Sequence, residues 1–274
     1  MEMVYSAIVI MIPLLLAATG GLFTERAGML NIALEGLLLI GAFSAVSAVY
    51  FTGSFAAGLA AATGASVLLS AILAFFTFKL RSNVFIAGLA ANLFAGGLTV
   101  VLSQRFFSTR GVVVLRDAGH LPVGMYACAS VLLLLTAWVV LYKTPFGFRL
   151  RACGRYATAL SSLGIQPDTY RWSAFLISGF FCGIGGSFLS LNLGAFVPNM
   201  TAGKGWIALV IIFLGGRRPL GILAAAFVFG LFESFSNYAQ GAYNIPADFI
   251  LAMPYLLTFA AMVFVSIWGK KGNC

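Results

Sequence analysis

The sequence predicts an all-α membrane protein, a polytopic bundle of transmembrane helices. The chain has 274 residues, of which 61% are hydrophobic and only 8% are charged. A soluble domain carries roughly 25% charged residues, so most of this surface is expected to face lipid. Apolar runs of about 20 residues, the length that crosses the hydrocarbon core, recur along the chain with short connections. We therefore expect one transmembrane domain over residues 1–274 and no soluble catalytic domain.

Nine apolar segments follow one another along the chain. We predict spans at about 4–23, 32–51, 54–78, 84–102, 124–142, 172–193, 206–214, 220–239 and 249–268. The seventh, Trp206 to Leu214, is too short to cross about 30 Å of hydrocarbon at 1.5 Å per residue. It predicts a half-helix or a helix lengthened by the flanking Gly203-Lys-Gly205 and Gly215-Gly216, and eight spans remain if the segment only re-enters the membrane. Broken helices need protein or a water-filled cavity over their freed backbone groups.

The net charge of +9 reflects orientation more than a polyanionic ligand, so nucleic acid is not an expected partner. With the amino terminus outside and the carboxyl terminus in the cytoplasm, twelve basic residues fall inside and four outside, as the positive-inside rule requires. The inside group is Arg26, Lys79, Arg81, Lys143, Arg149, Arg151, Arg155, Arg171, Arg217, Arg218, Lys270 and Lys271; the outside group is Arg105, Arg110, Arg116 and Lys204.

Two carboxylates lie at span depth. Glu35 follows Asn31 by one turn, and we expect both on one face of the second span, with Glu35 reaching the cytoplasmic interface to pair with Arg26 or a neighbouring helix. Glu233 lies deeper, near Asn237. A carboxylate inside a membrane costs a few kcal/mol and by default indicates function. For Glu233, a pore-facing or interhelical role and a substrate contact both stay open.

Small residues at helical spacing predict close helix packing. Gly179, Gly183, Gly186 and Ser190 recur on one face of the sixth span, and Gly88, Asn92 and Gly96 recur in the fourth. We expect these glycines to be structural.

Catalytic machinery is not expected in this chain. Gly203-Lys204 is followed by Gly205, so the Gly-x4-Gly-Lys-[Ser/Thr] phosphate loop is not formed. Neither a Ser-His-Asp set nor a metal cluster is indicated, and the four cysteines lack paired spacing. No cofactor and no metal are therefore expected, and any ATP hydrolysis belongs to another polypeptide.

The most informative stretch is a basic, glycine-containing loop over residues 143–171. Within it, Arg151–Ile165 predicts a short amphipathic helix that Gly164 can end. Such a helix lies either on anionic lipid or in the groove of a partner protein. Its small, alanine- and glycine-rich face favours the groove.

Four motifs in order along residues 5–268 resemble the permeases of ABC importers for branched-chain amino acids, simple sugars and nucleosides. The block Thr24-Glu-Arg-Ala-Gly-Met-Leu-Asn-Ile-Ala-Leu-Glu-Gly36 is similar to the family's Glu-Arg-[Ala/Ser]-Gly-x-x-Asn-[Ile/Leu]-x-x-Glu-Gly signature. Arg151–Ile165 looks like the cytoplasmic coupling helix, although Tyr156 and Thr158 depart from its usual form. Met200–Ala208 and Gly215–Gly221 are similar to two downstream motifs, with Arg217-Arg218 replacing a commoner single residue.

The resemblance implies residue roles, which are expectations here. The residues expected to couple to the ATPase are Arg151, Ala152, Gly154, Arg155, Ala157, Leu160, Leu163, Gly164 and Ile165. The signature residues expected to be structural are Glu25, Arg26, Gly28, Asn31, Glu35 and Gly36.

The resemblance also implies an assembly in a bacterial inner membrane. A second, longer permease chain would complete the pathway, and a cytoplasmic ATPase with two fused nucleotide-binding domains would bind ATP and Mg. A substrate-binding lipoprotein would deliver the solute from outside.

The shorter permease of nucleoside importers is the most similar member, so a purine nucleoside is the expected substrate. The candidate pathway residues, which could hydrogen-bond or stack on it, are Asn92, Asn192, Phe196, Trp206, Glu233 and Asn237. Ribose-like sugars and branched-chain amino acids are alternatives; a charged amino acid would need countercharges, and the deep positions offer Glu233 but no Arg or Lys. A stand-alone secondary transporter would show inverted repeats and paired broken helices, and a structural scaffold would need neither Glu233 nor the broken segment.

Overall fold

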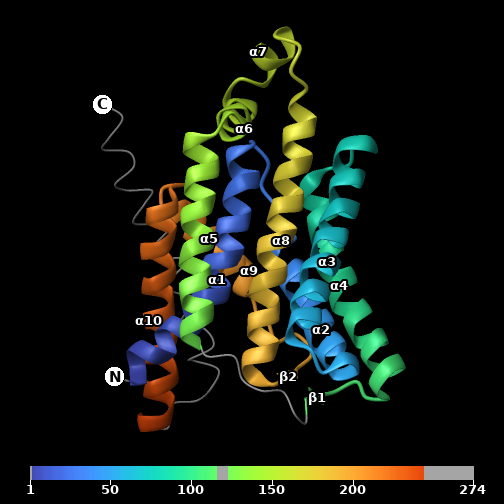
Figure 1. Cartoon of the computed structure of the whole chain (residues 1–274), viewed down its shortest axis with the longest axis vertical. Coiled ribbons are helices and arrows are strands. Elements are labelled where there is room, and N and C mark those ends of the chain that lie inside the picture. Colours follow the sequence, from blue (N-terminus) through green and yellow to red (C-terminus); the bar gives the residue numbers. More distant parts are fainter. Residues whose placement is uncertain (1, 116–122, 244–274) are drawn as a thin grey trace.

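The computed structural model describes residues 2–115 and 123–243, and this part of the chain is almost entirely helical (Figure 1). The elements in chain order are α1 (Glu2–Arg26), α2 (Leu34–Thr52), α3 (Phe55–Ala74), the π-helical turn η1 (Phe75–Lys79), α4 (Val84–Phe107), β1 (Val113–Val114), α5 (Val123–Lys143), α6 (Pro145–Arg155), α7 (Ala157–Ser162), α8 (Pro167–Leu193), β2 (Ala195–Phe196), α9 (Lys204–Leu214) and α10 (Pro219–Tyr243).

Seven of these helices are long and apolar enough to cross a membrane. They coincide with the predicted segments from the first to the sixth and the eighth to within a few residues at most ends, which confirms a polytopic helical bundle. The seventh predicted segment is α9, whose 11 residues cover about 17 Å at 1.5 Å per residue. The expectation of a short helix is therefore confirmed. The ninth predicted span, residues 249–268, lies outside the described residues.

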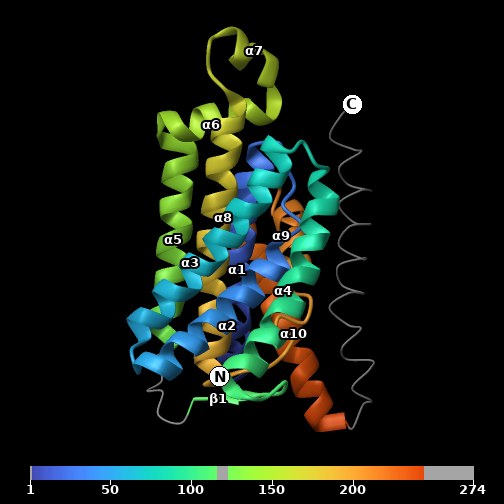
Figure 2. The same cartoon turned by 90° about the vertical axis from the view of Figure 1, so that its right-hand side faces the viewer.

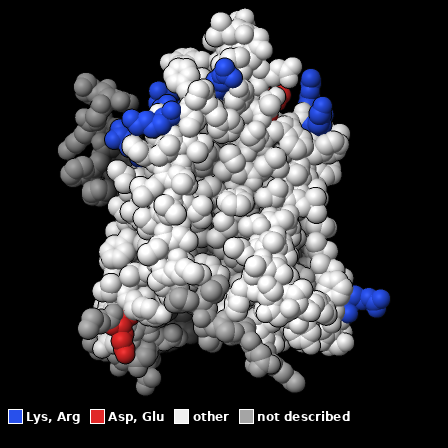
Figure 3. Space-filling model, viewed as in Figure 1, with Lys and Arg blue, Asp and Glu red and all other residues white. Residues whose placement is uncertain are grey.

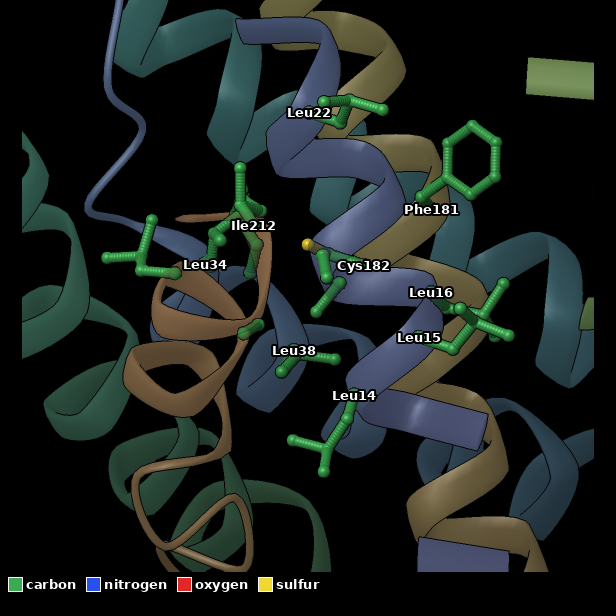
Figure 4. Packing of buried hydrophobic residues seen from close by; sticks show 14 of the residues in the cluster. Leu14, Leu15, Leu16, Leu22, Leu34, Leu38, Phe181, Cys182 and Ile212 are labelled. Carbon is green, nitrogen blue, oxygen red and sulfur yellow. The ribbon is translucent and has the colours of Figure 1, made fainter. Parts of the chain in front are cut away.

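The core lies where α1, α2, α8 and α9 meet. Figure 4 shows leucines of α1 in one cluster with Leu34 and Leu38 of α2, Phe181 and Cys182 of α8 and Ile212 of α9. Helix α1 is the most enclosed span, with 83% of its most apolar window buried inside the protein, whereas the corresponding window of α4 is only 17% buried. The bundle therefore has an inner group of helices and an outer group.

Glycines of α8 allow the inner helices to approach closely. An added Cβ at Gly179 would lie 2.8 Å from the carbonyl oxygen of Ser66 on α3, and one at Gly186 would lie 2.2 Å from that of Leu38 on α2. Gly183 meets Thr63 of α3 in the same way. The predicted packing role of these glycines is confirmed. For Gly96 it stays a prediction, because an added Cβ there meets no heavy atom within 4 Å among the described residues.

The bundle has two distinct ends. Helices α6 and α7 stand at one end, which we call the loop end, with α7 projecting beyond the other helices (Figures 1 and 2). At the other end, the strand end, β1 pairs antiparallel with β2, with Val113 opposite Phe196. In Figure 3 most of the visible Lys and Arg side chains lie at the loop end.

Candidate functional site

The basic loop folds into two short helices, and the prediction of one helix over Arg151–Ile165 is wrong. Helix α6 already begins at Pro145, where Thr144 caps it by accepting a hydrogen bond from the N–H of Gly147 at 3.2 Å. Tyr156, with φ −139° and ψ 49°, breaks the helix before α7. A threonine cap followed by proline at the first helical position is a start signal, and the sequence interpretation did not use it. Gly164, with φ +75°, follows the end of α7, as predicted.

Helix α6 is seated on the bundle by one face. Leu150 and Cys153 are buried, and the guanidinium of Arg151 lies 4.7 Å from the centroid of the Tyr142 ring, within cation–π range. Burial raises the pKa of the Cys153 thiol, and the charge of Arg171 only partly opposes this.

The other faces of α6 and α7 are open. Of the expected coupling residues, Gly154, Arg155, Leu163 and Gly164 are exposed, Arg151, Ala152, Ala157 and Ile165 are half-buried, and Leu160 is buried. Leu163 is 76% exposed and Tyr156 is 64% exposed. Two large apolar side chains are thus exposed on the loop that projects from the bundle.

The loop helix α6 approaches the end of α1 backbone to backbone at Gly154. An added Cβ at Gly154 would lie 2.5 Å from the carbonyl oxygen of Arg26, and one at Gly28 would lie 2.8 Å from Cα of Gly154. Gly28 also has φ +81°, a conformation that favours glycine. The contact therefore requires glycine on both sides, which explains Gly28 of the signature.

Charged residues of the signature hold the turn after α9 against the same end of α1. Arg217 lies 2.9 Å from the Glu25 carboxylate, and Arg26 donates hydrogen bonds to the Tyr142 hydroxyl at 2.9 Å and to the carbonyl oxygen of Arg217. Glu25, Arg26 and Arg217 line a cleft of about 640 Å³ at the loop end, together with Arg151 and Arg155 of α6. Arg217, noted in the sequence as a departure from the family pattern, thus has a structural partner.

The chain between α1 and α2 turns back into the bundle as a fixed, extended segment (Figure 1). Asn31 is fully buried; its amide donates to Ser178 of α8 at 3.0 Å, and its oxygen accepts from the N–H of Ala33. Because α2 begins only at Leu34, the prediction that Asn31 and Glu35 share a helical face is wrong. Asn92 of α4 donates to the carbonyl of Ile32 at 2.9 Å and accepts from the N–H of Gly36 at 2.8 Å. The only candidate pathway residue on α4 thus holds the start of α2.

Glu35 joins the start of α2 to the start of α9. Its carboxylate accepts hydrogen bonds from the backbone N–H groups of Gly203, at 2.8 Å, and Gly205, at 2.6 Å. Of the two expected partners, the neighbouring helix is confirmed and Arg26 is not, because α2 begins inside the bundle and α9 brings its first N–H groups to that point. A carboxylate at a helix amino terminus satisfies orphan donors and interacts favourably with the helix dipole. An added Cβ on Gly205 would lie 2.3 Å from the Glu35 nitrogen, so the two helix starts are in direct contact.

Lys204, the first residue of α9, forms an ion pair with Glu233 of α10. The Lys204 ammonium lies 3.0 Å from the Glu233 carboxylate, and the two side chains are 15% and 21% exposed. From Lys204 to the end of α9 at the loop end is about 15 Å at 1.5 Å per residue. The placement of Lys204 outside the membrane and the expectation of no deep basic residue are therefore wrong. The sequence Gly203-Lys-Gly205 has low hydropathy, so the sequence analysis did not include Lys204 in a span.

The other candidate pathway residues lie in different surroundings. Trp206 of α9 is 40% exposed, and Asn237, one turn beyond Glu233 on α10, is also exposed. Asn192 is half-buried near the end of α8. Phe196 of β2 is fully buried, with its ring 5.2 Å from that of Phe43 in an edge-to-face contact, so it is not available for stacking in this structure. Glu233 and Asn237, four residues apart, share one face of α10, where Lys204 of α9 contacts Glu233. Trp206 comes two residues after Lys204 and therefore lies on the other side of α9.

The family described as branched-chain amino acid transport system / permease component matches residues 3–266. The chain belongs to this permease family. It is thus a multi-pass membrane protein and a transport subunit.

Several curated permeases are similar over most of this chain. The nucleoside ABC transporter permease protein NupC of Lactococcus lactis and the guanosine ABC transporter permease protein NupQ of Bacillus subtilis are each 32% identical and cover 91% of this chain and 87% of their own lengths. A glucose ABC transporter permease protein of Haloferax volcanii is 25% identical over 96% of this chain and 78% of its own length. A further Lactococcus lactis chain, the nucleoside permease protein NupB, is 22% identical over 74% of this chain and 54% of its own length.

The solved structure of PsaBC from Streptococcus pneumoniae in complex with Fab has the same fold. It aligns with this permease at a TM-score of 0.54, over 95% of this chain and 91% of that chain, with 12% sequence identity. At this identity the likeness concerns the fold alone.

Proposed function

We propose that this permease forms half of the translocation pathway of an ATP-driven importer of nucleosides, with a purine nucleoside as substrate. The observation that carries the proposal is the loop at α6 and α7, which projects from the bundle, exposes apolar side chains at its tip and rests on the signature segment through Gly154. The two relatives named for nucleoside and guanosine transport support the substrate class.

In the proposed assembly the loop end faces the cytoplasm of a bacterium, and the protein lies in its inner membrane. The excess of Lys and Arg at the loop end supports this orientation. A cytoplasmic ATPase with two fused nucleotide-binding domains docks on α6 and α7 and binds ATP and Mg²⁺. The coupling residues from Arg151 to Ile165 lie in its groove and convert closure of the ATPase into helix movement.

The proposed pathway side is where α9 meets α10, at Glu233 and Asn237, and Trp206 on the exposed side of α9 is a further candidate contact. Polar groups at this depth are costly against lipid, so we place the second permease chain opposite them. The match of two Lactococcus lactis permeases to this chain supports such a pair. A substrate-binding lipoprotein docks at the strand end and delivers the solute.

A sugar importer is the second candidate, because the glucose permease of Haloferax volcanii is similar over nearly the whole chain. Uptake of labelled guanosine, inosine, glucose, ribose and leucine is compared in cells that lack the gene and in complemented cells. If the deletion loses nucleoside uptake alone, the proposal is supported. If it loses sugar or leucine uptake instead, that solute is the substrate and the proposed nucleoside is wrong.

The same cells test the docking loop. Gly154→Asp places a side chain against the Arg26 carbonyl, whereas Gly124→Asp on α5 makes the same exchange where an added Cβ meets no described residue within 4 Å. We expect Gly154→Asp to abolish uptake at an unchanged membrane level and Gly124→Asp to retain it. Equal uptake by both variants would contradict docking at α6 and favour a stand-alone transporter.

A further inference from the structure

Residues 27–36, which we call the connector, touch the loop helix α6 at one end and the short helix α9 at the other. We propose that the connector transmits movement of α6 to α9, and that Glu35 is the positioning residue through which α9 follows. The inference rests on the proposed function as an ATP-driven importer and adds the route inside this chain and the residue that completes it.

The first step is the contact at the loop end. Gly28 and Gly154 meet backbone to backbone, with no flexible side chain between them to absorb a displacement. Arg171, at the start of α8, adds a hydrogen bond to the carbonyl of Ala27 at 3.4 Å. Packed protein interiors are close to incompressible, so a shift of α6 toward the bundle displaces the connector.

The second step is the stiffness of the connector itself. A loop of this length would normally absorb movement, but its polar groups are bonded on two sides. Asn31 binds Ser178 of α8, and Asn92 of α4 binds the backbone at both Ile32 and Gly36. Because of these bonds, we expect the segment from Asn31 onward to move together with α2 and not to bend as a hinge.

The third step is the contact with α9. Glu35 accepts hydrogen bonds from the N–H groups of both Gly203 and Gly205, which are charge-assisted bonds and stronger than neutral ones. Gly203 has φ +84°, so the chain turns sharply just before α9 begins. Lys204 follows Gly203 and pairs with Glu233 on the proposed pathway side, so a shift of the Glu35 carboxylate moves this pair.

A static cap is the competing role for Glu35, and the two roles differ in a measurable ratio. If Glu35 only stabilises the start of α9, its substitution destabilises the permease and lowers ATP hydrolysis and transport together. If Glu35 transmits movement, its substitution leaves the ATPase docked and active, but ATP hydrolysis no longer moves α9. The deciding quantity is therefore the number of ATP molecules hydrolysed per substrate molecule imported.

The experiment uses the complete importer in proteoliposomes, with hydrolysis and uptake measured on the same sample. Glu35→Gln keeps the size of the side chain but offers one acceptor oxygen and an amide donor that faces the second N–H. We expect hydrolysis within about twofold of wild type and uptake lower by about tenfold, the factor that the loss of one charge-assisted hydrogen bond corresponds to. Glu2→Gln, at the exposed amino-terminal end of α1, is the matched control and keeps the wild-type ratio.

Glu35→Asp, which keeps the charge on a side chain one methylene shorter, gives an intermediate ratio and decides the test if Glu35→Gln does not assemble. A wild-type ratio in both variants overturns the inference, as does a parallel fall of hydrolysis and uptake. If the wild-type importer carries a sugar instead of a nucleoside, the proposed substrate fails, while the ratio measured with that sugar still decides the role of Glu35.

A second variant tests the other end of the route. Gly28→Ala disturbs the contact with Gly154 and is expected to raise the same ratio. Contacts on one route act in series, so combining Gly28→Ala with Glu35→Gln should give a ratio within about twofold of the worse single variant. Two unrelated defects would multiply, to about a hundredfold if each is tenfold, and that result would overturn transmission through the connector.

Discussion

Removal of one charge from the Lys204–Glu233 pair is expected to destabilise the protein markedly. The two groups lie 3.0 Å apart and are 15% and 21% exposed, so each is the main counter-charge of the other. Breaking a fully buried pair costs about 3–5 kcal/mol, and discounting for partial exposure leaves about 2–3 kcal/mol for Glu233→Gln or Lys204→Met. At about 2–4 °C per kcal/mol, each single variant should melt about 4–12 °C below wild type.

The charge swap, Lys204→Glu with Glu233→Lys, separates the pair from its surroundings. It restores the attraction and places a carboxylate at the start of α9, which the helix dipole favours by about 0.3–1 kcal/mol. The carboxylate of Glu35 already occupies that helix start and opposes this gain. We therefore expect the swap to return to within about 1 kcal/mol of wild type.

The assay is thermal unfolding of purified protein in detergent at one scan rate, because the apparent midpoint of an irreversible transition depends on that rate. If both single variants unfold at the wild-type midpoint temperature, the ion pair does not stabilise the protein. If the charge swap is no more stable than the less stable single variant, Lys204 and Glu233 do not stabilise the protein by attracting each other.

Three further results are expected. Gly154→Ala should lower the melting temperature, since its Cβ would lie 2.5 Å from the Arg26 carbonyl and overpacking costs about 1–3 kcal/mol; Gly124→Ala is the control, and equal melting of the two would contradict the close contact. Cys153 should be alkylated more slowly in the folded protein than in the unfolded chain, because its raised pKa leaves less thiolate at a given pH; the difference should narrow as the pH rises through that pKa, and mass-spectrometric peptide mapping measures it. Asn92→Ala should cost about 1–3 kcal/mol by leaving two backbone groups of the connector unpaired, with Asn92→Asp intermediate because it keeps the acceptor; melting curves check the order.

The spans could be predicted from the sequence because each depends on one local property, an apolar run of sufficient length. The same property identified α9 as short. The connector was marked by its signature residues, but their partners were not predictable. Glu35 meets Gly203, 168 residues away in the chain, and a hydropathy window considers each span alone.

Two errors have local causes instead. Thr144 and Pro145 mark the start of α6 in the sequence. The sequence interpretation did not use this cap and began the helix at Arg151, where the basic pattern begins. Lys204 was assigned to the outside because a charged residue between two glycines lowers the local hydropathy. Its partner Glu233, which satisfies the charge, lies on another helix. The proposed roles of the coupling and pathway residues remain predictions.

The unequal enclosure of α1 and α4 has a consequence for which substitutions each can accept. The two helices are almost equally hydrophobic, yet 83% of the apolar window of α1 is buried against protein and only 17% of that of α4. In α1, shape is the constraint: a change of volume leaves a void or a clash, even when the new side chain is equally apolar. In α4, partition into lipid is the constraint: leucine, valine and phenylalanine are interchangeable at Leu93, which is 79% exposed, whereas a charge there would oppose insertion. Among related sequences, α1 should therefore vary little in side-chain size, and the outer face of α4 should vary freely among apolar residues.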